Sequence, residues 1–150
     1  MLIGIGCDNI AVELKKEVIS EIIKQGHEVK DFGACADYPD AAYPVAKSIA
    51  DGECDRGILI CGTGIGMAIT ANKVKGVYAA VCHDIYSTQR SILSNNVQIM
   101  CMGTLVIGKS TAITLVDAWL NLEFKESPSR LKINKIKDIE NKYMEVKQSV

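Results

Sequence analysis

One stretch of the chain combines a cysteine with a glycine-rich loop. An apolar run ends at Cys61, and glycine then occupies every second position, as Gly62, Gly64 and Gly66. Because glycine has no side chain, the backbone N–H groups of these residues and of Ile65 can turn toward one point, and a helix that starts there adds its positive end. A cysteine in that place is expected to lose its proton more easily than a free thiol. The stretch predicts a nucleophile or base beside a site for negative charge.

The loop differs from the common nucleotide-binding motifs. Gly62 to Gly66 reads G-x-G-x-G, whereas a dinucleotide site needs G-x-G-x-x-G after the first strand. An acidic residue, Asp84, does follow eighteen residues after Gly66, but the spacing within the loop and the cysteine at its start argue against a dinucleotide. A Walker A loop is excluded because no Gly-Lys-Ser or Gly-Lys-Thr follows. We therefore expect a cradle for a phosphate or for an oxyanion formed during a reaction.

Short apolar runs alternate along the chain with longer stretches of helical period. This alternation is typical of a parallel sheet with helices on both faces. It predicts a three-layer α/β/α fold, Rossmann-like or flavodoxin-like, with a five-stranded parallel sheet. The predicted strands are Leu2–Gly6, Glu28–Phe32, Gly57–Cys61, Val77–Cys82 and Ile99–Met102. The predicted helices are one marked by Leu14 to Ile23 and ended by Gly26, followed by Tyr43–Asp51, Ile65–Val74, Tyr86–Ser94 and Ser110–Leu120.

The pattern changes after Trp119. Residues 123–129 are mostly polar and include Pro128, and an amphipathic helix is predicted over Leu131–Val146. We expect residues 1–150 to be one domain, with an α/β core over 1–122 and a C-terminal helical tail over 123–150 that caps the surface or packs on a partner subunit.

Ligands of such sheets bind beyond the carboxyl ends of the strands. This rule brings Asp8 and Asn9, the loop after Cys61, and His83 together, although they lie far apart in the sequence. Each residue outside the loop also has a simpler interpretation. Asp8 or Asn9 could cap the next helix, and His83 could be an ordinary surface histidine.

Composition narrows the function classes. The chain has 150 residues, 48% of them apolar, and a formal charge of −1 with no basic run, so nucleic acid and anionic membranes are poor partner hypotheses. Neither a membrane span nor a signal peptide is evident, which favours a cytoplasmic protein. None of the six cysteines is spaced as C-x-x-C, which argues against a zinc or dithiol site. Cys7, Cys82 and Cys101 fit buried apolar positions.

Several motifs of the chain together match a known family. They are Gly6-Cys7-Asp8, Asp37-Tyr38-Pro39-Asp40, Gly52-Glu53-Cys54-Asp55, the stretch from Gly57 to Gly66, Ala71-Asn72-Lys73, Asn95-Asn96 and Val116-Asp117-Ala118-Trp119-Leu120. Over nearly its whole length the chain resembles the type B ribose-5-phosphate isomerases and their relatives, the galactose-6-phosphate and allose-6-phosphate isomerases.

The resemblance implies an aldose–ketose isomerase that uses no metal or other cofactor. Cys61 would move the proton between carbon 2 and carbon 1 of an open-chain sugar phosphate through an enediolate. Thr63 and Asp8 would polarise or shuttle protons at the sugar hydroxyls. The substrate-binding residues implied are Asn9, Tyr38, Gly62, Gly64, Ile65, Gly66, Asn95, Arg130 and Lys132. Because family sites are completed across subunits, the resemblance also implies a homodimer or tetramer.

Three departures from the family pattern concern ring opening and phosphate binding. Ser94 stands where ribose-specific members have the histidine that opens the furanose ring, and Asn9 replaces a histidine that contacts phosphate. The C-terminal arginines of the family are missing, which leaves Arg130 and Lys132 as the nearest cations. His83 could stand in for the absent ring-opening acid or base.

These departures leave the substrate open. Ribose 5-phosphate with ribulose 5-phosphate is the first hypothesis. A hexose 6-phosphate is the alternative, with the chain as the cysteine-bearing subunit of a galactose-6-phosphate isomerase beside a homologous second subunit. A sugar-phosphate-binding protein without turnover is the alternative of another class.

Overall fold

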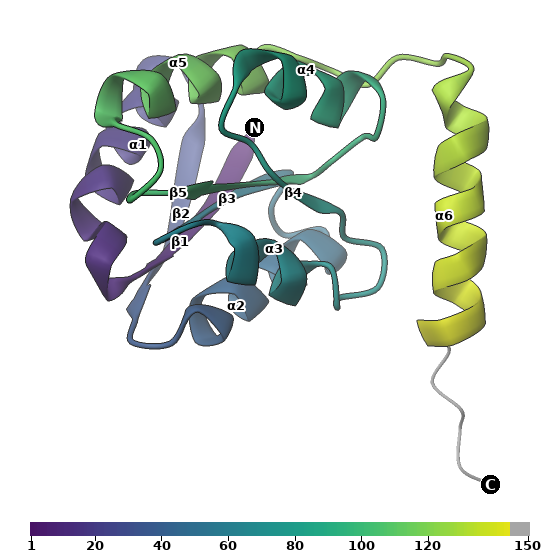
Figure 1. Ribbon diagram of the computed structural model, residues 1–150, viewed down its shortest axis with the longest axis horizontal. Helices are drawn as coiled ribbons and strands as arrows, with labels where there is room; N and C mark the ends of the chain where they lie inside the picture. Colours follow the sequence, from purple (N-terminus) through teal and green to yellow (C-terminus); the bar gives the residue numbers. More distant parts are fainter. Residues whose placement is uncertain (145–150) are drawn as a thin grey trace, which may run out of the picture.

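Five parallel strands form the sheet of the computed structural model, which describes residues 1–144 (Figure 1). The strands are β1 (Leu2–Asp8), β2 (Glu28–Cys35), β3 (Arg56–Cys61), β4 (Ala79–Val81) and β5 (Ile99–Gly103). The helices are α1 (Val12–Lys24), α2 (Tyr38–Ala50), α3 (Ile65–Ala71), α4 (Ile85–Leu93), α5 (Lys109–Leu120) and α6 (Ser129–Met144), and a short 3-10 helix, η1 (Asn9–Ala11), precedes α1.

The strand order is β2-β1-β3-β5-β4, and every paired strand runs parallel to its neighbour. Helices α1, α4 and α5 cover one face of the sheet, and α2 and α3 cover the other (Figure 1). The predicted three-layer, flavodoxin-like fold is therefore confirmed. Successive connections lead in opposite directions from β1, so a topological switch point lies between β1 and β3.

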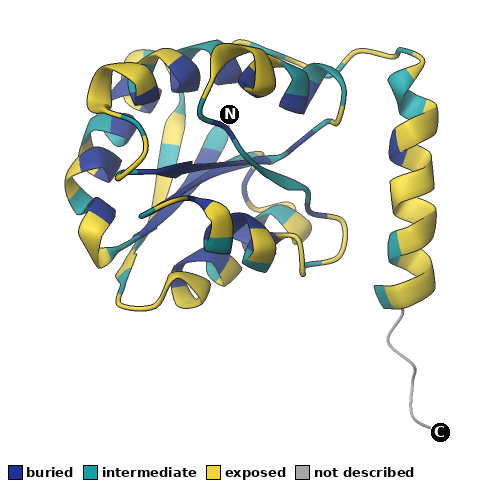
Figure 2. Cartoon of the chain, viewed as in Figure 1, coloured by how far each residue is buried: buried dark blue, intermediate teal, exposed yellow. Residues whose placement is uncertain are grey.

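Two apolar clusters, one on each face, hold the helices to the sheet (Figure 2). Alternation along the central strand sends Ile58 and Ile60 to the α1/α5 side, while Leu59 and Cys61 face α2 and α3. On the second face α2 comes close because the strands carry glycine there. A Cβ on Gly57 would lie 2.8 Å from a methyl group of Val45.

Helix α2 begins five residues before its predicted start at Tyr43, and that part of the prediction is wrong. Asp37 adopts an extended N-cap conformation, and Pro39 fits the first turn, where its missing N–H has no helical partner. Pro44, the second residue of the predicted helix, lies well inside the observed one. Burial of Ala41, Ala42, Val45 and Ala46 outweighs the hydrogen bond that this proline removes.

Two other elements are shorter than predicted. Helix α3 ends at Ala71 instead of Val74, and β4 covers Ala79–Val81 instead of Val77–Cys82. The side chain of Asn72, which follows α3 directly, accounts for the end of α3 and the start of β4. Its Nδ2 donates to the carbonyl of Ala79 at 2.9 Å, and its Oδ1 accepts the N–H of Ala79 at 2.8 Å. The amide of Asn72 thus occupies the outer edge of β4.

Helix α6 stands beyond β4, beside the α/β body (Figure 1). Glu140 attaches it by accepting the N–H of Gly76 at 2.8 Å and the hydroxyl of Tyr78 at 3.0 Å. Burial and the Glu140 carboxylate raise the pKa of Tyr78 to about 12. Ile133 is the buried residue of this helix. The predicted end of the tail helix, at residues 145 and 146, lies outside the described residues. Within residues 1–144 no helix is long and apolar enough to cross a membrane.

Candidate active site

Asp8 and Cys61 end the two neighbouring strands at the switch point. Cys7 pairs with Ile60, so the next residues, Asp8 and Cys61, lie at the same level. Alternation places both on the face covered by α2 and α3, because Cys7 and Ile60 belong to the opposite cluster. One oxygen of Asp8, Oδ1, is buried and has no hydrogen-bond partner within the described chain. Buried polar atoms rarely stay unpaired, so this oxygen is ready to bind a hydroxyl.

The Cys61 thiol is held by the loop that follows it. Its side chain is buried, and Sγ accepts the N–H of Gly64 at 3.0 Å. This contact places a backbone donor directly on the sulfur. Three other cysteines lie in or next to the strands. Burial raises the pKa of Cys7 to about 11, and it also raises the pKa of Cys82 and, strongly, that of Cys101.

The four amides that the sequence suggested would converge are divided between two tasks. Gly64 N–H donates to the Cys61 sulfur, and Ile65 N–H donates to Thr63 Oγ1 at 3.3 Å. Within residues 1–144, the N–H groups of Gly62 and Gly66 have no partner. The first pair shapes the loop, and the second pair remains free to donate to a bound oxygen.

Two of the loop glycines are required by geometry. Gly64 has φ +78°, and a Cβ on it would lie 3.0 Å from the backbone of Met102 in β5. A Cβ on Gly66 would lie 2.5 Å from the ring of Tyr38. Tyr38, at the start of α2, therefore lies directly against the start of α3, and its half-exposed ring borders the loop.

The turn after β5 fixes the other side of the loop, and its residues were not among those predicted from the sequence. Thr104 N–H donates to the Cys61 carbonyl at 2.9 Å, and Leu105 N–H donates to the Gly62 carbonyl at 3.1 Å. Gly103 lies so close that its Cβ would be 2.6 Å from the Gly62 oxygen. A glycine at the carboxyl end of a buried strand was the available signal, because the rule that selected the other strand ends applies to β5 as well.

His83 also belongs to this edge of the sheet. It follows β4, and its Nε2 accepts the N–H of Gly103 at 2.9 Å. Burial lowers the pKa of His83, and the neighbouring carboxylate of Asp84 partly opposes this effect. Asp84 itself caps α4 by accepting the N–H of Ser87 at 2.7 Å.

The remaining candidate residues lie elsewhere in the same chain. Helices run antiparallel to the strands, so Ser94 and Asn95, after α4, lie at the amino end of β5, away from Cys61 (Figure 1). Ser94 Oγ accepts the Arg90 Nε–H at 3.0 Å. Asn95 lines a cavity of about 490 Å³ between β4, α4 and α6. The structure thus separates this group from the cysteine loop.

Arg130 and Lys132 lie on α6, on the same remote side of the molecule (Figure 1). The Arg130 guanidinium pairs with Glu126 at 2.6 Å and lies over the Phe124 ring, 4.4 Å from its centroid. Lys132 is exposed. Among residues 1–144, neither cation makes a hydrogen bond or ion pair with the Cys61 loop of its own chain.

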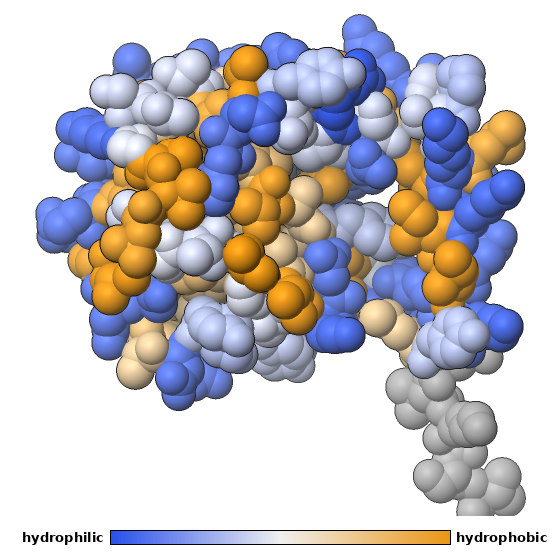
Figure 3. Space-filling view, in the orientation of Figure 1, coloured by the Kyte–Doolittle hydropathy of each residue, from blue (hydrophilic) through white to orange (hydrophobic). Residues whose placement is uncertain are grey.

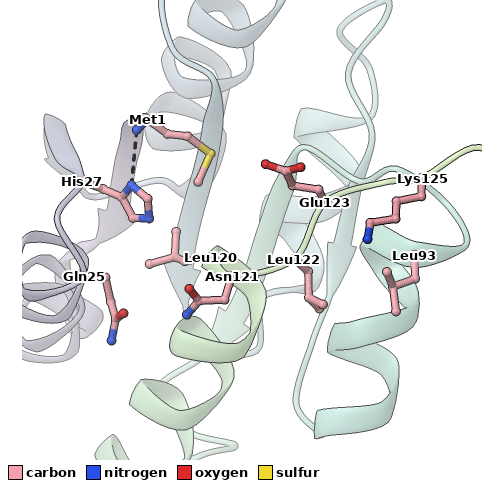
Figure 4. A pocket seen from close by; sticks show the side chains of 9 residues that line it. All are labelled: Met1, Gln25, His27, Leu93, Leu120, Asn121, Leu122, Glu123 and Lys125. Atoms are coloured by element: carbon pink, nitrogen blue, oxygen red, sulfur yellow. Dashed lines mark hydrogen bonds between the residues drawn. The ribbon is translucent and has the colours of Figure 1, made fainter.

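A second cavity, of about 530 Å³, lies at the amino ends of the strands, and its lining is mixed (Figure 4). The amino group of Met1 approaches His27 Nδ1 at 3.3 Å, and the segment that leads to α6 forms the opposite wall. Parallel α/β sheets bind ligands at the other edge, so this cavity is not the candidate active site. Residues 1–144 contain no group of three or more His, Cys, Asp or Glu that could hold a metal ion.

Fold and site together define the class of the protein: a flavodoxin-like α/β domain that carries a cysteine and a glycine loop at the switch point of its sheet. Comparisons with known proteins identify its family. The family described as Ribose/Galactose Isomerase matches residues 3–136. A protein of Listeria innocua named Ribose-5-P isomerase B is 46% identical over 146 residues, covering 95% of this chain and 99% of the relative.

Two further comparisons agree. The D-erythrulose-4-phosphate isomerase of Pectobacterium atrosepticum is 46% identical over 139 residues, covering 89% of this chain and 91% of the relative. The solved structure of ribose-5-phosphate isomerase B from Clostridium thermocellum matches with a TM-score of 0.92 and 44% identity, covering 95% of this chain and 99% of that one. The chain belongs to the ribose/galactose isomerase family and is a sugar-phosphate isomerase.

Proposed function

We propose that the chain interconverts ribose 5-phosphate and ribulose 5-phosphate, with Cys61 as the base. The observation that carries this proposal is the Gly64 N–H···Sγ contact of 3.0 Å at the switch point, since it holds the sulfur beside amides that have no partner among the described residues. The cysteine removes the proton from carbon 2 of the open-chain aldose and returns it to carbon 1. The proton on the carbonyl side moves from the carbon 2 hydroxyl to the carbon 1 oxygen.

The loop and Asp8 stabilise the intermediate of this reaction. An enediolate carries negative charge on oxygen, and the free N–H groups of Gly62 and Gly66 can donate to it. One such donor typically lowers a barrier by ~3 kcal/mol. Asp8 Oδ1, which has no partner among the described residues, accepts a sugar hydroxyl, and exposed Thr63 shuttles the proton between the two oxygens.

A tetrose 4-phosphate is the second candidate substrate, and Ser94 favours it. The family resemblance assigns ring opening to a histidine at this position, and this chain has none there. A tetrose phosphorylated at carbon 4 has no hydroxyl with which to close a furanose ring, so it needs no ring-opening group. One of the similar proteins is named D-erythrulose-4-phosphate isomerase.

A second copy of the chain is proposed to complete the site. The loops that follow the five strands carry Asp8, Asp37 and Asp84 but no Lys or Arg, as read over Asp8–Ala11, 36–37, Gly62–Gly64, 82–84 and 104–108. A phosphate dianion next to three carboxylates needs a cation. Arg130 lies too far away in its own chain, so we assign it, with Lys132 and Asn95, to the site of the other subunit.

The surface around the cysteine loop supports the same partner. Ile10 and Leu105 are 59% and 76% exposed, and both come within 3.4 Å of the place a Cβ on Gly62 would take. Apolar side chains gather on the side of the molecule at which β5 ends (Figure 3). A polar sugar phosphate gains little binding energy from an apolar rim. Contact with a second subunit would instead bury these apolar side chains.

The substrate is tested with a coupled isomerase assay over tetrose 4-, pentose 5- and hexose 6-phosphates, run with this chain alone and with any homologous chain encoded beside it. We expect the highest kcat/KM with a pentose or tetrose phosphate. Exchange of the carbon 2 proton in deuterated water must accompany turnover. Binding without exchange on any sugar would show a binding protein and refute the catalytic proposal.

The shared site is tested by mixing two inactive variants, Cys61→Ala and Arg130→Ala. If each site uses residues of both subunits, random exchange regains about a quarter of wild-type activity, because half of the dimers are mixed and each mixed dimer has one intact site. Cys61→Ala mixed with the double variant Cys61→Ala/Arg130→Ala is the matched control and must stay inactive. No recovery in the first mixture would place both residues in one subunit's site, and an Arg130→Ala variant that is active on its own would exclude Arg130.

A further inference from the structure

One histidine of the chain, His83, accepts a hydrogen bond from the end of the strand that packs against the Cys61 loop. We propose that His83 is a positioning residue: by accepting the Gly103 N–H, it holds the end of β5 against the Cys61–Thr63 backbone and thereby sets the orientation of the loop amides. The inference rests on the proposed function only for its kinetic readout, because the hydrogen bond itself is independent of the substrate.

The connection runs through backbone contacts. Gly103 is the last residue of β5 and pairs with Cys61. Its N–H is not used in the sheet but donates to His83 Nε2 at 2.9 Å. The next two residues, Thr104 and Leu105, donate to the carbonyls of Cys61 and Gly62 at 2.9 and 3.1 Å. These carbonyls therefore point into the β5 turn, so the N–H groups of Gly62 and Thr63, which belong to the same two peptides, face away from it.

Close packing makes this link rigid. A Cβ on Gly103 would lie 2.6 Å from both the Gly62 oxygen and the Thr63 Cα. The two backbones are in direct contact, and no side chain lies between them to absorb a movement. If Gly103 rotates, the Gly62–Thr63 peptide must move with it.

The protonation state of His83 agrees with this role. An Nε2 that accepts an N–H carries no proton, so the neutral ring must hold its proton on Nδ1. Burial lowers the pKa of His83 and keeps the ring neutral near pH 7. Asp84, beside it in the chain, is the charged group acting on the ring, and the thiols of Cys82 and Cys101 stay uncharged because burial raises their pKa.

Three substitutions distinguish positioning from acid–base chemistry. His83→Gln places an acceptor oxygen where Nε2 stood, whereas the shorter side chain of His83→Asn ends near the place of Nδ1 and cannot reach Gly103. His83→Leu removes all polarity. We expect Gln to keep kcat within about threefold of wild type, and Asn and Leu to lower it at least about tenfold with a smaller change in KM.

Two outcomes of this series would overturn the proposal. Equal loss in all three variants would mean that the imidazole itself transfers protons. Wild-type rates in all three would mean that the hydrogen bond has no role. Melting curves by circular dichroism for each variant separate lost activity from lost folding.

Two measurements need no activity. Nitrogen-15 NMR of the wild-type ring should show an unprotonated Nε2 and a protonated Nδ1, and a proton on Nε2 would refute the geometry. Iodoacetamide should label Cys61 at the wild-type rate in His83→Gln but at an altered rate in His83→Asn, since the Gly64 donor moves with the loop. If the protein has no isomerase activity on any sugar, these two results still decide the proposal.

Discussion

Replacement of Gly64 by alanine tests the loop most directly. Gly64 has φ +78°, a conformation that costs an alanine ~1–2 kcal/mol. The new Cβ would also lie 3.0 Å from the N, Cα and C atoms of Met102, which belong to the backbone of β5 and cannot rotate away. Together these effects should lower the free energy of unfolding by ~2–4 kcal/mol. For a chain of this length that is a fall in Tm of ~5–15 °C.

The same change should affect turnover more than binding. To relieve the contact the loop must move, which weakens the Gly64 N–H bond to the Cys61 sulfur. We expect kcat to fall at least ~10-fold with a smaller change in KM, because the lost interaction acts mainly in the transition state. The coupled assay and urea unfolding on the same preparation measure both effects.

Gly66→Ala is the matched control. Its Cβ would meet the Tyr38 ring at 2.5 Å, but that ring is 44% exposed and can swing outward. Stability should change by less than ~1 kcal/mol, with the helical preference of alanine offsetting the displaced ring, and KM should rise. Our reasoning is refuted if Gly64→Ala loses no more stability and kcat than Gly66→Ala. A rise in KM alone for Gly64→Ala would mean that the loop holds the substrate phosphate.

Three other outcomes are expected. Cys61→Ala should abolish turnover with little change in Tm, and iodoacetamide should label Cys61 faster than Cys7, whose pKa of about 11 keeps it protonated; a near-wild-type rate would exclude Cys61 as the base. Ser94→His should raise the rate from ribose 5-phosphate more than carbon 2 exchange on open-chain substrate, and equal effects would mean that Ser94 is not at the ring-opening position. Because the folded pKa of Tyr78, about 12, lies above the ordinary value of 10, its contribution to stability is complete below pH 10 and is lost as pH rises toward 12. Glu140→Gln should flatten this loss in pH-dependent melting curves, and an unchanged slope would contradict the assignment.

The sequence predicted the sheet and the position of its reactive edge because both depend on local patterns. The apolar run before Cys61 and the alternate glycines after it indicate a buried strand and a loop, and the doubly wound fold then fixes which strand ends meet. Gly103 escaped this reasoning because its importance lies in a contact with Gly62 that joins segments about forty residues apart. The partner of His83 is invisible in the sequence for the same reason.

The early start of α2 and the separation of Arg130 from Cys61 show two other features that the sequence alone does not predict. Pro44 is locally unfavourable inside a helix, and only burial of the surrounding residues overrides it. The resemblance implied a site completed across subunits, but it did not indicate which predicted residues, such as Arg130, a single chain holds apart from Cys61. Whether they meet between two chains depends on an interface, which no pattern within one sequence describes.

The side-chain amide of Asn72 affects how readily the protein aggregates through the edge of its sheet. A sheet that ends in an open strand is a template on which other chains can grow, and β4 would be such a template. Asn72 satisfies both backbone groups of Ala79, so an incoming strand finds no partner at that residue. Asn72 and Ala79 are only seven residues apart, so the contact involves no distant part of the chain. This protection can therefore form once α3 and β4 have folded, before α6 packs beside them.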